Sequence, residues 1–222
     1  MKQNLVILFI LISTFALGQN HFVGFQAGLN LTSITPKEDL ENSSMRTGFI
    51  GGITYDFKLS IKYQIEIDAL YSQQGFTDKM IMVENGQVRV GEENYKVKYD
   101  YLSFPIKIGY RMGDKTKIIP KIGIIPAFSV SAKLSYPKFD NDGNIIDWGS
   151  ENHKDYVSNF DFGGLIEIGI ENELSNNFIF CSAISYKHSL TTYYNSDYFD
   201  RYDDQARKHY GFSLSVGLKY KL

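Results

Sequence analysis

The best candidates for catalysis in this chain are His188 and the adjacent Ser189. A lipid hydrolase would need a serine, a histidine and a carboxylate or amide within hydrogen-bond reach of one another. The two residues lie in a segment that alternates like a β-strand, in which consecutive side chains point to opposite faces. They therefore cannot partner each other directly, and His21, His153 and His209 show no companion spacing. Because no recognisable motif is present, we expect no catalytic residues and no enzymatic activity.

Three aspartates, Asp140, Asp142 and Asp147, are the best candidates for binding a metal ion. An EF-hand loop places oxygen ligands at its first, third and fifth positions, glycine at the sixth and glutamate at the twelfth. With Gly143 at the sixth position, a lysine falls at the first and a glycine at the twelfth. The register fails at both ends, so we expect a solvated turn with no metal and no cofactor.

Seven charged residues occur singly on the polar side of segments that alternate polar and apolar side chains. They are Lys62, Glu66, Asp68, Lys107, Lys121, Asp161 and Glu167. If these segments enclose a narrow interior, the acidic and basic members must neutralise one another, since an unpaired buried charge is costly. We expect an ion-pair network that plugs the interior; a narrow selective pore is the alternative.

A stretch rich in tyrosine and aspartate, residues 191–210, comes before the last strand-like segment. Its candidate contact residues are Tyr194, Tyr198, Asp200, Tyr202, Asp203 and Asp204. Tyrosine suits a contact surface, because its ring offers a large apolar area with a polar tip. We expect this loop to contact a partner outside the cell, although an extended, solvated loop would have the same composition.

The first 18 residues have the composition of a secretory signal peptide. Lys2 supplies the positive start, residues 5–15 are apolar, and the small residues Ala16 and Gly18 predict cleavage before Gln19. The apolar run is shorter than the roughly 20 residues that a spanning helix needs. We therefore expect residues 1–18 to be a signal peptide and residues 19–222 to form a single exported domain.

Eight segments alternate with the two-residue period of a β-strand. The clearest is residues 60–73, and the last, residues 211–222, alternates to the final residue. The others are residues 22–31, 47–57, 98–110, 118–133, 159–170 and 178–190. In one of them the apolar phase changes between Tyr101 and Leu102, close to Pro105, which predicts a bulge at the proline.

Short and long connections alternate strictly between these segments. The short ones are residues 58–59, 111–117 and 171–177, and the long ones are residues 32–46, 74–97, 134–158 and 191–210. This alternation is typical of outer-membrane β-barrels, which have tight periplasmic turns and long external loops. Asn85-Gly86 and Asp142-Gly143 predict that two long loops project as hairpins. Counting the first hairpin as two membrane strands would give ten; we expect eight, because its arms are short and run into a charged stretch.

The composition of the polar face indicates which face lies inside. That face is rich in glycine and serine with isolated charges, whereas a water-facing surface would carry more long charged side chains. An eight-stranded interior is just wide enough to be filled by side chains. We therefore expect lipid on the apolar face. A soluble exported barrel that binds a small apolar ligand in its lumen, and an outer-membrane lipid-modifying enzyme, are the alternatives.

Several stretches are similar to the PorT-like outer-membrane β-barrel family. They are residues 23–32, 101–113, 121–128, 160–171 and 213–222. The resemblance implies an eight-stranded barrel that the outer-membrane assembly machinery inserts. In this family the machinery recognises a terminal strand that ends in an aromatic residue; here Leu222 stands in that position. Founding members are linked to a protein-secretion apparatus, which makes an envelope protein complex a candidate partner.

Together these patterns predict an all-β protein: an eight-stranded, antiparallel, up-and-down transmembrane β-barrel in the outer membrane of a two-membrane bacterium. Its expected partners are outer-membrane lipids, the assembly machinery and an envelope protein complex. The net charge of −2 argues against nucleic acid, which would call for a basic surface. We expect a monomer whose external hairpins make its contacts.

Overall fold

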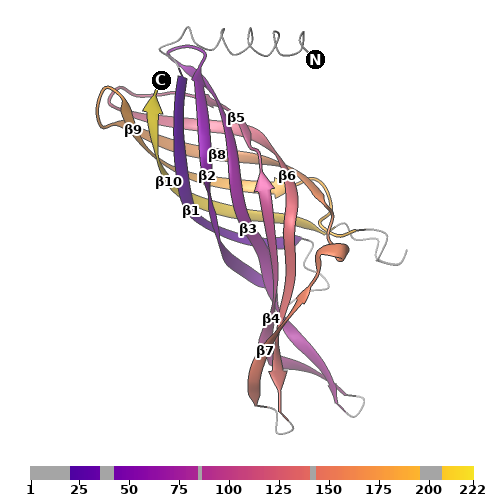
Figure 1. Cartoon of the computed structure of the whole chain (residues 1–222). Coiled ribbons are helices and arrows are strands. Elements are labelled where there is room, and N and C mark those ends of the chain that lie inside the picture. The colour runs from indigo at the N-terminus through magenta and orange to yellow at the C-terminus, as the bar shows by residue number, and fades with distance from the viewer. Residues whose placement is uncertain (1–20, 36–42, 85–86, 141–143, 196–206) are drawn as a thin grey trace, which may run out of the picture.

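The computed structural model describes residues 21–35, 43–84, 87–140, 144–195 and 207–222. These parts of the chain form ten β-strands and one short 3₁₀ helix (Figure 1). The strands are β1 (His21–Thr35), β2 (Ser44–Lys58), β3 (Tyr63–Glu84), β4 (Gln87–Ser103), β5 (Ile106–Tyr110), β6 (Thr116–Phe139), β7 (Ile145–Asn152), β8 (Phe160–Glu173), β9 (Phe178–Ser189) and β10 (Lys208–Lys221), and the helix is η1 (Lys154–Tyr156).

The strands close into an antiparallel ring with eight positions. β1 pairs with both β2 and β10, and the ring continues from β10 through β9, β8, β6, β4 and β3 back to β2. β5 occupies the same position as β4, because both pair with β3 on one side and β6 on the other. Among the described residues β7 pairs with β6 alone, outside the ring. The predicted eight-stranded antiparallel barrel is confirmed.

The short connections lie at one end of the barrel and the two hairpins extend from the other (Figure 1). The first hairpin continues β3 and β4 and is paired as far as Glu84 and Gln87. The second continues β6 and turns back as β7, with Phe139 opposite Ile145. Both hairpins are therefore extensions of barrel strands. The turn residues Asn85-Gly86 and residues 142–143 lie outside the described residues.

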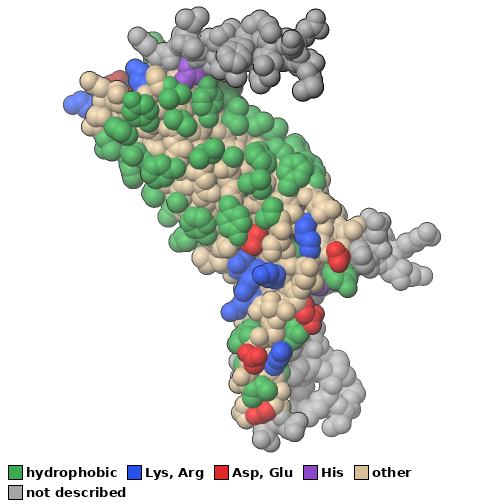
Figure 2. All heavy atoms as spheres, viewed as in Figure 1, with side chains coloured by type: hydrophobic (Ala, Val, Ile, Leu, Met, Phe, Trp, Pro, Cys, Tyr) green, Lys and Arg blue, Asp and Glu red, His purple; other side chains and the backbone are tan. Residues whose placement is uncertain are grey.

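The side chains alternate between the outside and the inside of the barrel as predicted. On the outer face Ile53, Ile122 and Leu214 are each about 60% exposed, whereas Glu66 and Lys219 inside are 3% exposed. Figure 2 shows hydrophobic side chains over the barrel wall, with Lys, Arg, Asp and Glu at the two ends of the barrel and on the hairpins. The alternative with an apolar lumen and a charged outer surface is wrong, because the polar side chains lie inside. No helix in the described parts of the chain is long and apolar enough to cross a membrane.

Neighbouring strands approach closely at glycines. A Cβ atom on Gly28 would lie 2.0 Å from the carbonyl oxygen of Leu214 on β10, and one on Gly52 would lie 2.1 Å from the carbonyl oxygen of Ala69 on β3. Real Cβ atoms do not come this close to backbone atoms. The local sheet geometry therefore requires glycine at both positions.

The predicted bulge at Pro105 is wrong. β3 keeps the same register on both sides of the proline, because Leu70 pairs with Ser103 and Ile67 with Ile106. The register shift lies on the neighbouring strand β6, where Val130 has no partner on β4. The apolar phase changes in the sequence because two buried aromatic side chains, Tyr99 and Tyr101, face the lumen before the lipid-facing series begins.

Candidate functional site

Charged side chains from six strands meet inside the half of the barrel nearer to the short turns. We call them the ion-pair cluster. Its members are Asp56 on β2, Glu66 and Asp68 on β3, Lys107 on β5, Arg111 just after β5, Lys121 on β6, Glu167 and Glu171 on β8, and Lys219 on β10. All their side chains are less than 10% exposed. Five carboxylates thus face four cations in a closed space.

Glu66 lies at the centre of the cluster, where it contacts three lysines. Its Oε1 pairs with Lys107, its direct cross-strand neighbour on β5. Its Oε2 accepts hydrogen bonds from the Nζ atoms of Lys121 at 2.7 Å and Lys219 at 3.0 Å. Because these lysines belong to three different strands, one carboxylate links much of the barrel wall across the lumen.

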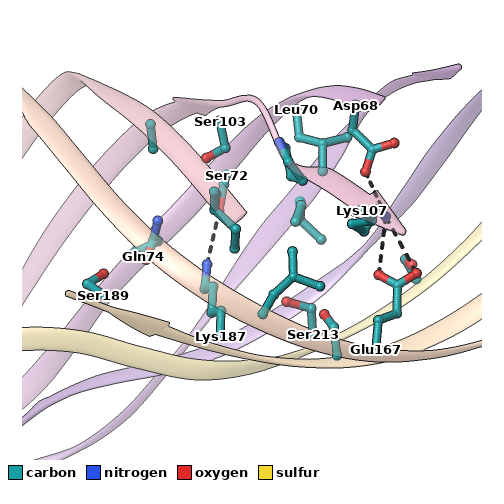
Figure 3. Close-up of a pocket in the computed structure, with 18 of the residues that line it drawn as sticks. Asp68, Leu70, Ser72, Gln74, Ser103, Lys107, Glu167, Lys187, Ser189 and Ser213 are labelled. Atoms are coloured by element: carbon teal, nitrogen blue, oxygen red, sulfur yellow. Dashed lines mark hydrogen bonds and ion pairs between the residues drawn. The ribbon is translucent and has the colours of Figure 1, made fainter. Parts of the chain in front are cut away.

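The lysines extend these links to the other carboxylates. Lys107 Nζ lies 2.8 Å from Asp68 Oδ2 and 3.3 Å from Glu167 Oε2 (Figure 3). Lys121 Nζ donates to Glu167 Oε1 at 2.8 Å. The cluster is therefore a network rather than a set of separate pairs. A network of this kind holds its members in a low-dielectric interior, where a lone charge would be costly.

On the other side of the cluster, Lys219 contacts three carboxylates. Its Nζ lies 2.5 Å from Asp56 Oδ2 and 3.0 Å from Glu171 Oε1, in addition to its contact with Glu66. Arg111 Nη2 lies 3.6 Å from Glu171 Oε2. The predicted network omitted Asp56, Glu171, Lys219 and Arg111. Asp56 and Lys219 lie in the inward phase of segments 47–57 and 211–222, and Glu171 lies one residue past segment 159–170, so the alternation in the sequence was a signal for all three.

Five of the seven residues expected in the network are brought together, and two are not. Lys62 is exposed in the turn before β3, because the strand begins only at Tyr63 and the alternating pattern runs past its end. Asp161 is buried farther along the lumen. Its carboxylate accepts hydrogen bonds from Ser189 Oγ at 2.7 Å and Thr191 Oγ1 at 2.8 Å, and it makes no ion pair with the described residues.

A small polar chamber of about 50 Å³ lies between the ion-pair cluster and the outer end of the barrel. Ser72, Ser103, Ser189 and Ser213 line it, and the amine of Lys187 points into it and donates to Ser72 Oγ at 3.4 Å (Figure 3). A space of this size holds a few water molecules, since one needs about 10–15 Å³.

Four buried aromatic rings pack together at the outer end of the lumen, and we call them the aromatic layer: Tyr99, Tyr101, Tyr193 and His209. Ring centroids of Tyr99 and of Tyr193 each lie 5.0 Å from that of His209, and Tyr101 lies 5.9 Å from it. Ile34, Phe76 and Val97 belong to the same buried apolar cluster. The inward phase of Tyr99 and Tyr101 was the available signal in the sequence, and it was interpreted as a bulge instead.

His188 and Ser189 have separate partners. The Nδ1 atom of His188 lies 3.2 Å from the hydroxyl of Tyr186, whereas Ser189 donates to Asp161. Across the ranges that the structure describes, no group of three or more His, Cys, Asp or Glu side chains could hold a metal ion.

One of the expected loop contact residues is described. Tyr194 is half-buried and lies edge-on against Tyr193, with ring centroids 5.9 Å apart, and it forms an isolated β-bridge with Val157. Tyr198, Asp200, Tyr202, Asp203 and Asp204 lie outside the described residues.

One known domain family matches most of the chain. Residues 17–195 match the outer membrane protein beta-barrel domain. Similar solved structures include Neisserial surface protein A, with 11% identity, a TM-score of 0.47, and coverage of 92% of this chain and 98% of that one. OprG from Pseudomonas aeruginosa has 14% identity, a TM-score of 0.47 and coverage of 91% and 96%. Ail, the attachment invasion locus protein of Yersinia pestis, has 11% identity, a TM-score of 0.43 and coverage of 90% and 99%. No curated protein matches the chain.

The family match agrees with the geometry, in which an apolar outer face surrounds a polar, charge-filled lumen and long hairpins leave one end. The chain therefore belongs to the outer membrane protein beta-barrel domain family and resides in the outer membrane of a two-membrane bacterium.

Proposed function

We propose that this protein is a non-enzymatic, closed outer-membrane barrel that acts by contact through its external hairpins. The observation that carries the proposal is the ion-pair cluster. Cations and carboxylates from six strands fill the lumen with side chains that are nearly inaccessible to water. An aqueous diffusion channel generally needs about 16–18 strands, so a lumen of eight strands crossed by such a network favours a plug.

Recordings of conductance in planar bilayers test the closed lumen. We expect the purified protein to insert without large, stable conductance steps. A variant that removes the exposed turn lysine, Lys62→Ser, is the matched control, because it alters the charge of the protein but not the lumen. Large stable steps from the unmodified protein would contradict the plug.

The external hairpins support a contact role because they carry exposed apolar side chains beyond the barrel. The pairing of β4 with β6 ends at Lys96 and Ser135, and β6 continues past this point paired with β7. On this second hairpin Ile146 is 66% exposed and Trp148 is 42% exposed, with the amine of Lys96 lying 4.9 Å from the Trp148 ring centroid. Exposed aromatic and aliphatic side chains bordered by charges are typical of protein contact sites.

The resemblance to the PorT-like family favours an envelope protein complex as the partner. We further propose that residues 1–18 are removed as a signal peptide, that the assembly machinery inserts the barrel, and that it is monomeric in lipid.

Co-purification from crosslinked envelopes tests the contact role. We expect the captured complex to be lost in the double variant Ile146→Ser/Trp148→Ser and retained in Leu174→Ser, which changes an exposed apolar residue in a short turn at the opposite end.

A further inference from the structure

A cleft of about 370 Å³ opens where the external hairpins leave the barrel, outside the lipid-facing wall. Its lining is dominated by six Phe and Tyr rings, those of Phe76, Tyr95, Tyr99, Tyr136, Tyr156 and Tyr193. These come from β3, β4, β6, η1 and the segment after β9. Ligand pockets in proteins measure about 300–1,000 Å³ and are mostly lined by hydrophobic and aromatic side chains, and this cleft meets both criteria.

The cleft is separate from the lumen. Tyr99 and Tyr193 belong both to its lining and to the aromatic layer, with their ring centroids 5.4 Å apart. The same rings that close the outer end of the barrel thus form the floor of the cleft. A solute could enter it from outside the cell without reaching the polar chamber.

The polar ends of the lining rings already have partners. The hydroxyl of Tyr95 donates to Asp78 Oδ2 at 3.3 Å, and that of Tyr136 donates to Glu151 Oε1 at 2.7 Å. Burial lowers the pKa of the lining His153, so its imidazole is neutral at pH 7. What these residues offer a ligand is chiefly ring surface.

These features decide between three classes of ligand that bind to aromatic side chains. A sugar would need several hydrogen bonds to replace those it makes with water, and buried polar groups left unpaired are costly. A quaternary ammonium ion would approach the guanidinium of Arg207, which also lines the cleft. An aromatic ring needs only offset-stacked or edge-to-face contacts, and lining rings already make an edge-to-face contact with one another, as between Phe76 and Tyr95 with ring centroids 6.5 Å apart.

We propose that this cleft binds a small, uncharged aromatic compound, with a single ring or two fused rings, from the medium outside the outer membrane. This inference goes beyond the contact role of the hairpins and does not depend on it. It also leaves the lumen closed, since the ligand binds above the aromatic layer.

Binding of 5-fluoroindole to the full mature chain in lipid nanodiscs tests the proposal, with fluorine NMR as the readout and empty nanodiscs as the reference for partition into lipid. We expect saturable binding. Tyr156→Ala removes a 40% exposed lining ring from η1 and should weaken binding about tenfold, since ring stacking and the accompanying burial together amount to roughly this factor. Leu134→Trp should block binding by filling the cleft.

The matched control is Tyr63→Ala, which removes a similarly exposed ring at the opposite end of the barrel and should leave binding unchanged. Equal losses in Tyr156→Ala and Tyr63→Ala would overturn the proposal, because they would indicate binding to the barrel wall. Absence of saturable binding would also overturn it. So would saturable binding of methyl β-glucoside or tetramethylammonium where 5-fluoroindole gives none. If Leu134→Trp does not fold, the comparison of binding affinity between Tyr156→Ala and Tyr63→Ala decides alone.

Discussion

Replacement of Lys219 by methionine should strongly destabilise the barrel. Lys219 is 3% exposed and its amine is the cation shared by Asp56, Glu66 and Glu171, at 2.5, 3.0 and 3.0 Å. Methionine fills a similar volume but leaves five carboxylates of the cluster against three cations. Breaking a buried ion pair by removing one partner costs about 3–5 kcal/mol, because the other charge stays buried without compensation. We expect the free energy of unfolding to fall by about this amount.

The measurement is equilibrium unfolding of the barrel in lipid vesicles with denaturant, followed by tyrosine and tryptophan fluorescence. Lys62→Met is the matched control, since it removes the same charge from an exposed turn and should change the free energy of unfolding by no more than about 0.5 kcal/mol. The pair separates the effect of burial from the effect of net charge.

A double-mutant cycle with Asp56 tests the reasoning itself. Lys219 is the one cation within ion-pair distance of Asp56 among the described residues. In the unmodified protein, Asp56→Asn should be destabilising, whereas in the Lys219→Met background it should be neutral or stabilising, because it then removes an uncompensated charge. A coupling energy of about 0.5–3 kcal/mol is typical of residues in one network. A loss below 0.5 kcal/mol for Lys219→Met, or additive effects of the two substitutions, would refute the account of the cluster.

The remaining predictions concern the barrel wall. Gly28→Ala should reduce the folded fraction seen by heat-modifiable gel mobility, because its Cβ would meet the Leu214 carbonyl, whereas Gly164→Ala should fold normally, since its nearest atom is 3.9 Å away. Normal folding of both would contradict the close packing of β1 and β10. Ile184→Arg, in the middle of β9 on the lipid face, should lower the free energy of unfolding in vesicles by about 2–4 kcal/mol. Ile61→Arg in the exposed turn should have little effect, and equal effects would argue against lipid on the outer face.

Most of the barrel was predictable because its main signal is local. A strand that separates lipid from a polar lumen must alternate with period two, and residues 60–73 carry that pattern without any knowledge of their neighbours. The alternation of short and long connections then fixed the strand order, since consecutive antiparallel strands pair. The hairpin arms of β3 and β4 were placed correctly outside the wall, because their charged residues do not suit a lipid-facing surface.

The ion-pair cluster was predictable only in part, because pairing across a lumen depends on height along the barrel axis. Alternation indicates that Asp161 and Glu167 both face inward on β8, but not that one lies beside lysines and the other beside Ser189. The height of each side chain along the barrel axis follows from the stagger of all the strands around the barrel. Lys62 shows a second limit, since a two-residue pattern does not indicate where a strand begins.

The aromatic layer was missed because the rule that assigns apolar residues to lipid holds only within the bilayer. At the outer end the strands continue beyond the lipid, and apolar side chains there bury themselves inward, as Tyr99 and Tyr101 do. The lumen is consequently crossed by side chains at two levels, by charges near the short turns and by rings near the hairpins, with a small chamber between. Loss of one cation from the cluster would weaken the barrel but leave the rings in place. Because the aromatic layer remains in Lys219→Met, the absence of conductance in this variant is expected from the rings alone. The stability of the barrel is therefore the measurement that reports on the ion-pair cluster.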